Sequence, residues 1–356
     1  MAQIDETAAF SGTMAVRSQH VFDVARLEAW MAENVEGFEG PLSVEQFKGG
    51  QSNPTYKLTA KSGEYVMRRK PPGKLLPSAH AVDREYKAIA ALSKVDFPVA
   101  RAYGLCQDDR VLGSAFYVMG FVDGRIIWDQ TLPNMEKAER AAIYDAMNET
   151  MARLHKVDYQ AIGLGDFGKP GNYFTRQIDR WTKQYKASET ETIEAMDRLI
   201  EWLPGRVPAT ETTTIVHGDY RLDNMIFHKT EPRVIAVLDW ELSTLGDPLA
   251  DFSYHAMAWR LRPELFRGVA GIDFKGLGIP TEEEYVAAYC RRTGRDRIDN
   301  WDFYLVYNMF RIAGILQGIM GRVVAGTAAS AQAAEMGARV RPIAEQAWAL
   351  AQTLDR

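Results

Sequence analysis

The sequence has 356 residues, 46% of them hydrophobic and 25% charged, with a formal net charge of −5. This length exceeds what one small core needs and predicts two lobes or one large α/β domain. The acidic charge balance provides no positive surface for binding a nucleic acid backbone. The two cysteines lie far apart in sequence and predict neither a disulfide framework nor a metal site. The sequence contains no run of about 18 apolar residues, so we expect no membrane span. We therefore expect a cytoplasmic protein, monomeric or homodimeric, that engages neither nucleic acid nor membrane.

Roughly the first 120 residues predict a β-rich lobe with one internal helix. Two strand-like stretches flank a Lys-Ser-Gly turn, which is typical of a hairpin, and the pair Gly49-Gly50 leads into it. Glu85 shares a helix face with Val82 and Ile89, an unusual place for a carboxylate. In chain order the predicted elements are a helix over 21–35, strands over 56–59 and from 65, a helix over about 79–93, and strands near 99–105 and 114–121.

The rest of the chain predicts mostly helices. Thr281 and Glu284 have the spacing of a capping box, and Gly294 suits the end of the same helix. We therefore predict an α+β fold with two lobes, a nucleotide-binding N-lobe over 1–122 and a C-lobe over 123–356. The further predicted elements are a helix over 135–156, one or two helices over 174–203, short strands over 214–216 and 234–238, and helices over 281–294, 301–323 and 333–354.

The stretch VHGDYRLDN (216–224) crowds polar groups behind a short apolar run. Its pattern H-x-D-x-x-x-x-N has the spacing of the kinase catalytic loop. Asp219 follows the first short strand, Asn224 lies five residues on, and Asp239 ends the second strand. A carboxylate there is unfavourable unless it is paired or binds a cation, and Mg²⁺ prefers oxygen ligands. The pattern favours convergence on a metal and a phosphate over the alternative that these residues only form turns.

Several motifs together resemble the aminoglycoside phosphotransferase and choline kinase family, which shares the protein-kinase-like fold. The motifs are GGQSNPTYKL (49–58), YVMRR (65–69), REY (84–86), VHGDYRLDN (216–224) and VLDWELSTLGDPLADF (237–252). They occur in the order of that family and span most of the chain. A further stretch, GLGDFGKPGNYFTRQIDRWTKQY (163–185), is similar to phosphotransferase domains found near, or fused to, acyl-CoA dehydrogenases.

The resemblance implies a set of site residues and two small-molecule requirements, ATP and Mg²⁺. Asp219 would be the catalytic base, and Asn224 and Asp239 would hold Mg²⁺. Where kinases usually carry Lys, this chain has Arg68, a planar fork that would contact the ATP phosphates, with Lys70 as the other candidate. The remaining nucleotide contacts would come from the loop Gly49, Gly50, Gln51, Ser52 and Asn53 over the phosphates, from Glu85 paired with the cation, and from the backbone of Met119 to Phe121 against adenine.

Other polar and aromatic residues favour structural roles. We expect His217 to support the loop, and Asp247 and Asp251 to cap a helix and brace the loop rather than bind metal. Arg221 and Asp223 stay open between structural and substrate-facing roles. The aromatic residues that the sequence offers for an acceptor pocket, more often found in a core, are Trp128, Tyr173, Phe174, Trp181 and Tyr185.

The resulting hypothesis is ATP- and Mg²⁺-dependent phosphoryl transfer to a hydroxyl of a small molecule. The narrower resemblance suggests a hydroxyacyl chain or its CoA thioester as acceptor, with aminoglycoside, choline-like and sugar acceptors open and ATP the default donor over GTP. Trp240 and Glu241 follow Asp239 and no activation segment is evident, which favours a small-molecule acceptor over a protein. The alternatives are a non-catalytic, kinase-like regulatory module and, disfavoured by only six scattered histidines, a metal-dependent phosphoesterase.

Overall fold

The computed structural model describes residues 12–48, 53–71, 81–327 and 332–355. The chain divides into two compact units, each assembled from three stretches. Unit 1 is Met1–Trp128, Asp158–Phe167 and Arg221–Ser243, and unit 2 is Asp129–Val157, Gly168–Tyr220 and Thr244–Arg356. The lobe boundary expected at residue 122 stays a prediction.

Unit 1 is built on a six-stranded antiparallel sheet with the order β1-β2-β3-β4-β6-β5. The hairpin of β3 and β4 and the strands β5 and β6 lie where the sequence predicts them, whereas β1 and β2 were not predicted. The strands are β1 (Thr13–Met14), β2 (Ser43–Phe47), β3 (Thr55–Ala60), β4 (Gly63–Arg69), β5 (Ala102–Cys106) and β6 (Phe116–Gly120).

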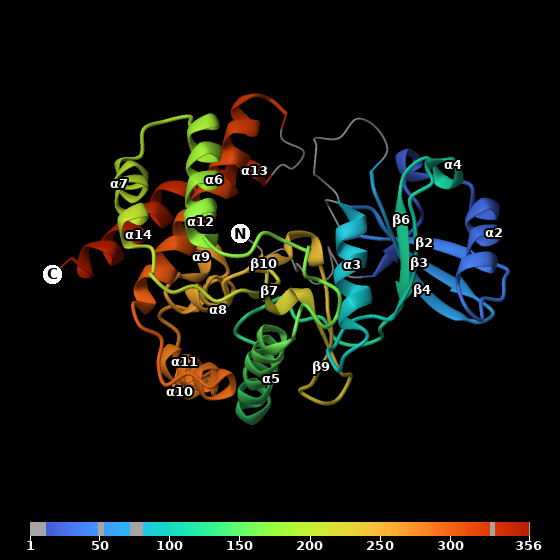
Figure 1. Ribbon diagram of the computed structural model, residues 1–356, viewed down its shortest axis with the longest axis horizontal. Coiled ribbons are helices and arrows are strands. Elements are labelled where there is room, and N and C mark those ends of the chain that lie inside the picture. The colour runs from blue at the N-terminus through green and yellow to red at the C-terminus, as the bar shows by residue number, and fades with distance from the viewer. Residues whose placement is uncertain (1–11, 49–52, 72–80, 328–331, 356) are drawn as a thin grey trace. The chain divides into compact units, whose positions relative to one another are not determined.

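Helices α2 (Val24–Asn34) and α3 (Val82–Leu92) cover opposite faces of this sheet, and α4 (Asp109–Leu112) is a single turn (Figure 1). Because side chains alternate along a strand, Tyr65 and Met67 of β4 join the apolar core beneath α2, while Arg68 faces α3. The core on the α2 side contains Leu27, Met31, Val35, Tyr56, Leu58, Tyr65, Met67, Cys106, Leu112, Phe116 and Val118.

A second part of unit 1 is the hairpin of β8 (Met225–Phe227) and β9 (Val234–Val237), between the short helices η3 (Leu222–Asn224) and η4 (Trp240–Leu242). Gly124 passes so close to β8 that a Cβ there would lie 2.3 Å from the Phe227 carbonyl oxygen. Only glycine fits this crossing without displacing backbone. The Trp240 indole closes the hairpin, donating to the Val237 carbonyl at 3.0 Å.

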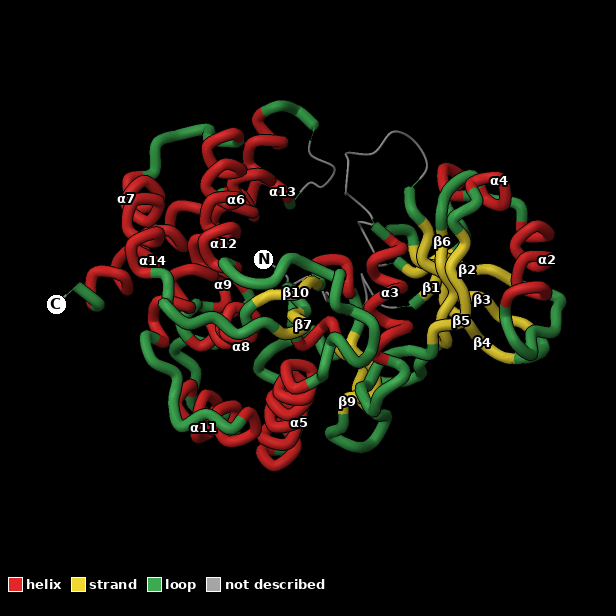
Figure 2. The backbone as a smooth tube through the Cα atoms, viewed as in Figure 1, coloured by secondary structure: helices red, strands yellow, loops and turns green. Residues whose placement is uncertain are grey.

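Unit 2 is mostly helical, as Figure 2 shows, with one short antiparallel pair, β7 (Thr214–Val216) and β10 (Thr244–Gly246). The predicted helix over 174–203 is two helices, and the predicted one over 333–354 is also two. The capping box of Thr281 and Glu284 is confirmed. The helices are α5 (Lys137–Lys156), α6 (Tyr173–Ala187), α7 (Glu194–Trp202), η2 (Leu203–Arg206), α8 (Pro248–Ala256), η5 (Met257–Trp259), α9 (Pro263–Phe266), α10 (Phe274–Leu277), α11 (Glu282–Thr293), α12 (Trp301–Val324), α13 (Ala333–Gly337) and α14 (Val340–Thr353).

Helix α12 forms the centre of unit 2 and packs against α6, α8 and α14. By length and composition it is apolar enough to cross a membrane, which the sequence analysis did not anticipate. However, 83% of its most apolar window is buried inside the protein, as in the core helix of a globular domain. We therefore describe α12 as the helix around which unit 2 is packed.

Candidate active site

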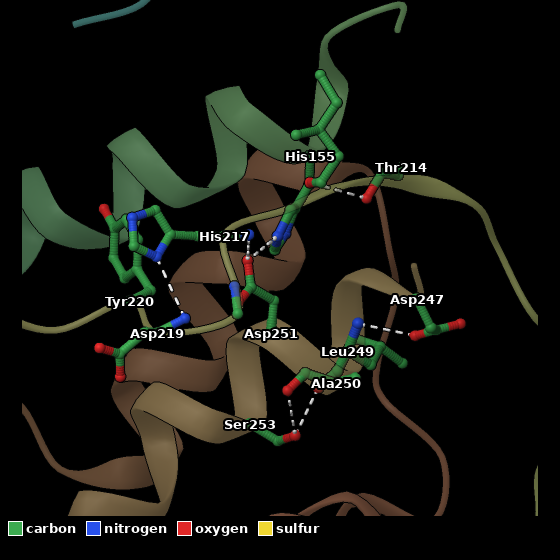
Figure 3. Close-up of polar contacts among 12 residues, drawn as sticks. His155, Thr214, His217, Asp219, Tyr220, Asp247, Leu249, Ala250, Asp251 and Ser253 are labelled. Carbon is green, nitrogen blue, oxygen red and sulfur yellow. Dashed lines mark hydrogen bonds and ion pairs between the residues drawn. The ribbon is translucent and has the colours of Figure 1, made fainter. Parts of the chain in front are cut away.

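The loop that carries Asp219 follows β7 directly and is anchored by Asp251 of α8. The fully buried Asp251 carboxylate accepts the backbone N–H groups of His217 at 2.7 Å and Gly218 at 2.8 Å (Figure 3). The His155 ring Nε2 lies 3.2 Å away on a third side. Burial alone would raise the pKa of Asp251, but its hydrogen bond to His155, its electrostatic interactions with His155 and His217, and the His217 backbone bond hold it below its ordinary value. Asp251 is therefore an ionised brace for this loop.

His217 completes the loop from inside. Its ring is fully buried, and its Nδ1 accepts the backbone N–H of Asp219 at 3.2 Å (Figure 3). This bond places the lone pair on Nδ1 and so fixes the tautomer with the proton on Nε2. The geometry agrees with the loop-supporting role expected for His217.

Two residues that the sequence analysis did not single out act on Asp219. The Tyr254 hydroxyl of α8 donates to Oδ1 of Asp219 at 2.5 Å. Arg311 of α12 donates from Nη2 to the Gly218 carbonyl at 2.7 Å, and its guanidinium carbon lies 4.9 Å from the centre of the Tyr254 ring. Each had a signal in the sequence: Tyr254 lies one helical turn after Asp251, and Arg311 interrupts an apolar helix.

Unit 1 carries the predicted metal ligands at the open end of the β8–β9 hairpin. The Leu238 N–H donates to the Asn224 carbonyl at 2.8 Å, which extends the pairing to Asn224, just before β8, and leaves Asp239 two residues after β9. Asp239 has a positive φ of 64°, a left-handed conformation that is uncommon for residues other than glycine. Such strain is often found where a side chain must be aimed at a ligand.

Arg68 is the cation that meets Glu85, as the resemblance implies. Its Nη1 lies 3.2 Å from the Glu85 carboxylate and 3.1 Å from Asp239. Asn53 Nδ2 and the Tyr117 hydroxyl donate to Glu85 at 2.8 and 2.9 Å. Burial raises the pKa of Glu85 and outweighs the opposing effect of Arg68, so the ionised acid depends on these donors. The carboxylate on an apolar helix face is explained by this network.

The donor chemistry at the hairpin end fits Mg²⁺. Asn224 and Asp239 both offer oxygen, and about a third of the Asp239 side chain is exposed, at 32%. Mg²⁺ commonly takes one or two protein oxygens and completes its shell with water and phosphate oxygens. Among the described residues no group of three or more His, Cys, Asp or Glu side chains could hold a metal.

The remaining nucleotide contacts stay predictions. Gly49, Gly50, Gln51 and Ser52 lie outside the described residues. Met119 lies within β6, and the N–H groups of the next two residues are already used in the sheet: Gly120 donates to Arg101 at 2.8 Å and Phe121 to Glu64 at 3.3 Å. Adenine recognition by this segment would therefore rely on carbonyl groups or on residues after 121.

The other residues weighed from sequence are structural where contacts are seen. Asp247 is the N-cap of α8 and accepts from Leu249 at 2.8 Å (Figure 3). Phe174 is fully buried against three aromatic rings of α12. Tyr185 is also fully buried. Capping and core roles thus account for these residues without an acceptor.

Comparison with known proteins identifies relatives across most of the chain. The family model described as "Phosphotransferase enzyme family" matches residues 43–303. Acyl-CoA dehydrogenase family member 10 of Mus musculus is 49% identical over 311 residues, covering 87% of this chain and 29% of that protein. Family member 11 of the same species is 43% identical over 349 residues, covering 96% and 44%. The chain thus spans less than half the length of these curated relatives.

Comparison with solved structures identifies proteins with a similar fold. A crystal structure of a candidate aminoglycoside phosphotransferase from Ralstonia eutropha has 60% sequence identity and a TM-score of 0.88, covering 94% of this chain and 99% of that one. Choline kinase from Cryptosporidium parvum, at 11% identity, has a TM-score of 0.66 over 94% and 96% of the two chains. A thermostable aminoglycoside phosphotransferase variant with ADP and hygromycin B, at 16% identity, has a TM-score of 0.58 over 90% and 98%. The predicted kinase-like α+β fold is confirmed.

Proposed function

We propose, from the fact that the chain belongs to the phosphotransferase enzyme family, that it transfers the γ-phosphate of ATP to a hydroxyl of a small molecule in the presence of Mg²⁺. The observation that carries this proposal is the placement of Asp219. Its own N–H is held by His217, the two residues before it are held by Asp251, and its carboxylate is held by Tyr254. So much support around one carboxylate suits a general base better than a turn former.

Asp219 would take the proton of the acceptor hydroxyl as the hydroxyl oxygen bonds to the γ-phosphorus. The bond from that phosphorus to the β,γ-bridging oxygen breaks, and ADP leaves. General-base assistance of this kind contributes roughly 10²- to 10⁴-fold in rate. Arg68 would contact the phosphates, since its charge lies on the same face as Asp239. Asn224 and Asp239 would hold Mg²⁺, which neutralises phosphate charge when bound.

Nucleotide binding is supported by the neighbour that was crystallised with ADP and hygromycin B. For the acceptor we propose a hydroxyacyl chain or its CoA thioester. The support is the name of the curated relatives, acyl-CoA dehydrogenase family members 10 and 11, together with the motif over 163–185. Aminoglycosides, amino alcohols and sugars are the acceptors against which this assignment must be compared.

The test is transfer from γ-labelled ATP with Mg²⁺ to hydroxy acids, hydroxyacyl-CoAs, amino alcohols, sugars and aminoglycosides. Asp219→Asn is expected to lose about 10²- to 10⁴-fold in kcat while still binding ATP. Asp239→Ala is expected to lose Mg²⁺-dependent nucleotide binding itself. Asp179→Asn removes an exposed carboxylate of α6 that pairs with Lys183 at 2.8 Å and serves as control.

The outcomes separate the possible functions. A labelled product that disappears in Asp219→Asn and persists in the control supports the kinase and names the acceptor class. Tight Mg·ATP binding without product from any acceptor would replace the proposal with the regulatory module. Reversed behaviour of the two site variants would refute the assigned roles.

A further inference from the structure

The contact between Tyr254 and Asp219 is short and well supported. At 2.5 Å it has the length of a hydroxyl bound to an ionised carboxylate. Tyr254 is only 5% exposed, so its ring approaches Asp219 from within unit 2 rather than from solvent. It lies one turn after Asp251 on α8, so the helix that anchors the loop also supplies the phenol.

Arg311 holds the same phenol from a second helix. Its guanidinium lies over the Tyr254 ring, a cation–π arrangement, while its Nη2 bonds the carbonyl of the residue before Asp219. The Arg311 side chain is itself buried, at 8% exposure, between this ring and that of Trp181. Helices α8 and α12 therefore fix both the phenol and the backbone beside the carboxylate.

We propose that Tyr254 is a positioning residue that fixes the rotation of the Asp219 carboxylate. The phenol donates to Oδ1 of Asp219 and so holds the carboxylate in one orientation. This inference rests on the proposed function, because it gives Tyr254 a role only in a reaction that uses Asp219 as base.

Tyr254→Phe removes the hydroxyl and keeps the ring under Arg311. We expect kcat to fall about 10- to 100-fold, the range for losing a hydrogen bond to a charged group, with the KM for Mg·ATP within about twofold of wild type. Tyr144→Phe is the matched control, since it also removes a buried phenol, one that donates to the Gln130 carbonyl at 2.6 Å. The control is expected to retain kcat.

A double-mutant cycle with Asp219→Asn separates positioning from general damage. If Tyr254 acts only through Asp219, adding Tyr254→Phe to Asp219→Asn lowers kcat by no more than about twofold. A structural role would instead multiply the two losses, and a full 10- to 100-fold further loss would overturn the proposal.

A second double-mutant cycle measures the coupling between Tyr254 and Asp219 through protein stability, independently of catalysis. Urea unfolding of Tyr254→Phe, Asp219→Ala and the double variant is expected to show a coupling of about tenfold or more in the unfolding equilibrium constant. Coupling without phosphoryl transfer to any acceptor would overturn the proposed function while supporting the contact. Transfer without coupling in either cycle would overturn the positioning role and leave the proposed function standing.

Discussion

Asp251→Asn is expected to destabilise unit 2 markedly, because Asp251 anchors the loop that carries Asp219. The His217 and Gly218 N–H groups bond different oxygens of this carboxylate, at 2.7 and 2.8 Å. An amide offers one acceptor oxygen, so one of the two N–H groups stays buried without a partner, which costs about 1–3 kcal/mol. The surviving bond loses its charge, about 1 kcal/mol more. The expected loss is therefore about 2–4 kcal/mol.

Asp247→Asn is the matched control on the same helix, one turn earlier. Asparagine caps helices as well as aspartate does, so the bond from Leu249 is kept. Its second bond, at 3.1 Å, comes from the N–H of Thr212, an exposed residue near which water can replace a lost acceptor. Burial raises the pKa of Asp247, so a neutral side chain is tolerated there. We expect this variant to lose less than about 1 kcal/mol.

The stabilising contribution of Asp251 is expected to depend on pH. Its pKa is lower in the folded than in the unfolded protein, so the carboxylate adds stability above its ordinary pKa of about 4. That contribution disappears as the pH falls through the folded pKa. The difference in the free energy of unfolding between wild type and Asp251→Asn should therefore be largest at neutral pH and should shrink as the pH falls.

The assay is urea unfolding followed by circular dichroism at several pH values, with thermal melts beside it. For a folded unit of this size, each kcal/mol corresponds to about 2–4 °C in Tm. Under the proposed function, Asp251→Asn should also lower kcat, because a displaced base is poorly aligned. Equal midpoints for the Asp251 and Asp247 variants at neutral pH would refute the reasoning.

Three further predictions concern buried groups elsewhere. Glu85→Ala leaves Asp239 to pair with the buried Arg68 and removes the acceptor of Asn53 and Tyr117, so it should cost about 1–3 kcal/mol, whereas Glu85→Gln keeps an acceptor oxygen and should cost less; equal urea midpoints for the two would contradict this. Burial lowers the pKa of His255 to about 4. As the pH falls from 6.5 to 4, this histidine is protonated in the unfolded but not in the folded protein, so the free energy of unfolding should drop by up to about 3 kcal/mol. A His255→Phe protein whose stability falls equally steeply over this pH range would refute the prediction. Gly124→Ala should lose about 1–3 kcal/mol and Gly165→Ala, with open space around it, almost nothing, as measured by Tm.

Periodic patterns predicted the elements whose side chains divide cleanly between core and solvent. Buried side chains alternate along most of β3, β4 is marked by the apolar run Tyr65-Val66-Met67, and Glu85 stood out because the face it shares is otherwise apolar. Strand β2 was missed because its five residues include one buried side chain and the rest are partly or fully exposed, so its alternation carries little signal. Strands β8 and β10 are three residues long, too short for a period to be read.

The site shows where sequence patterns stop. The H-x-D-x-x-x-x-N spacing pointed to Asp219 and Asn224, and the position at the end of a short apolar strand pointed to Asp239. Both signals depend only on residues that are neighbours in sequence. Which group holds Asp219 depends instead on how α8 and α12 pack in unit 2. Tyr254 and Arg311 are distant in sequence from Asp219, so tertiary packing alone brings their side chains to it.

One nitrogen atom of Arg68 serves two acids, and this sharing makes them competitors. Nη1 lies 3.2 Å from Glu85 and 3.1 Å from Asp239. A ligand that draws Asp239 away leaves Glu85 to hold the guanidinium alone, which tightens α3 onto β4. By thermodynamic reciprocity, a substitution in α3 that loosens Glu85 turns Arg68 toward Asp239 and weakens binding there. Under the proposed function, sequence variation along α3 would thus tune ligand affinity at Asp239 through the shared Arg68.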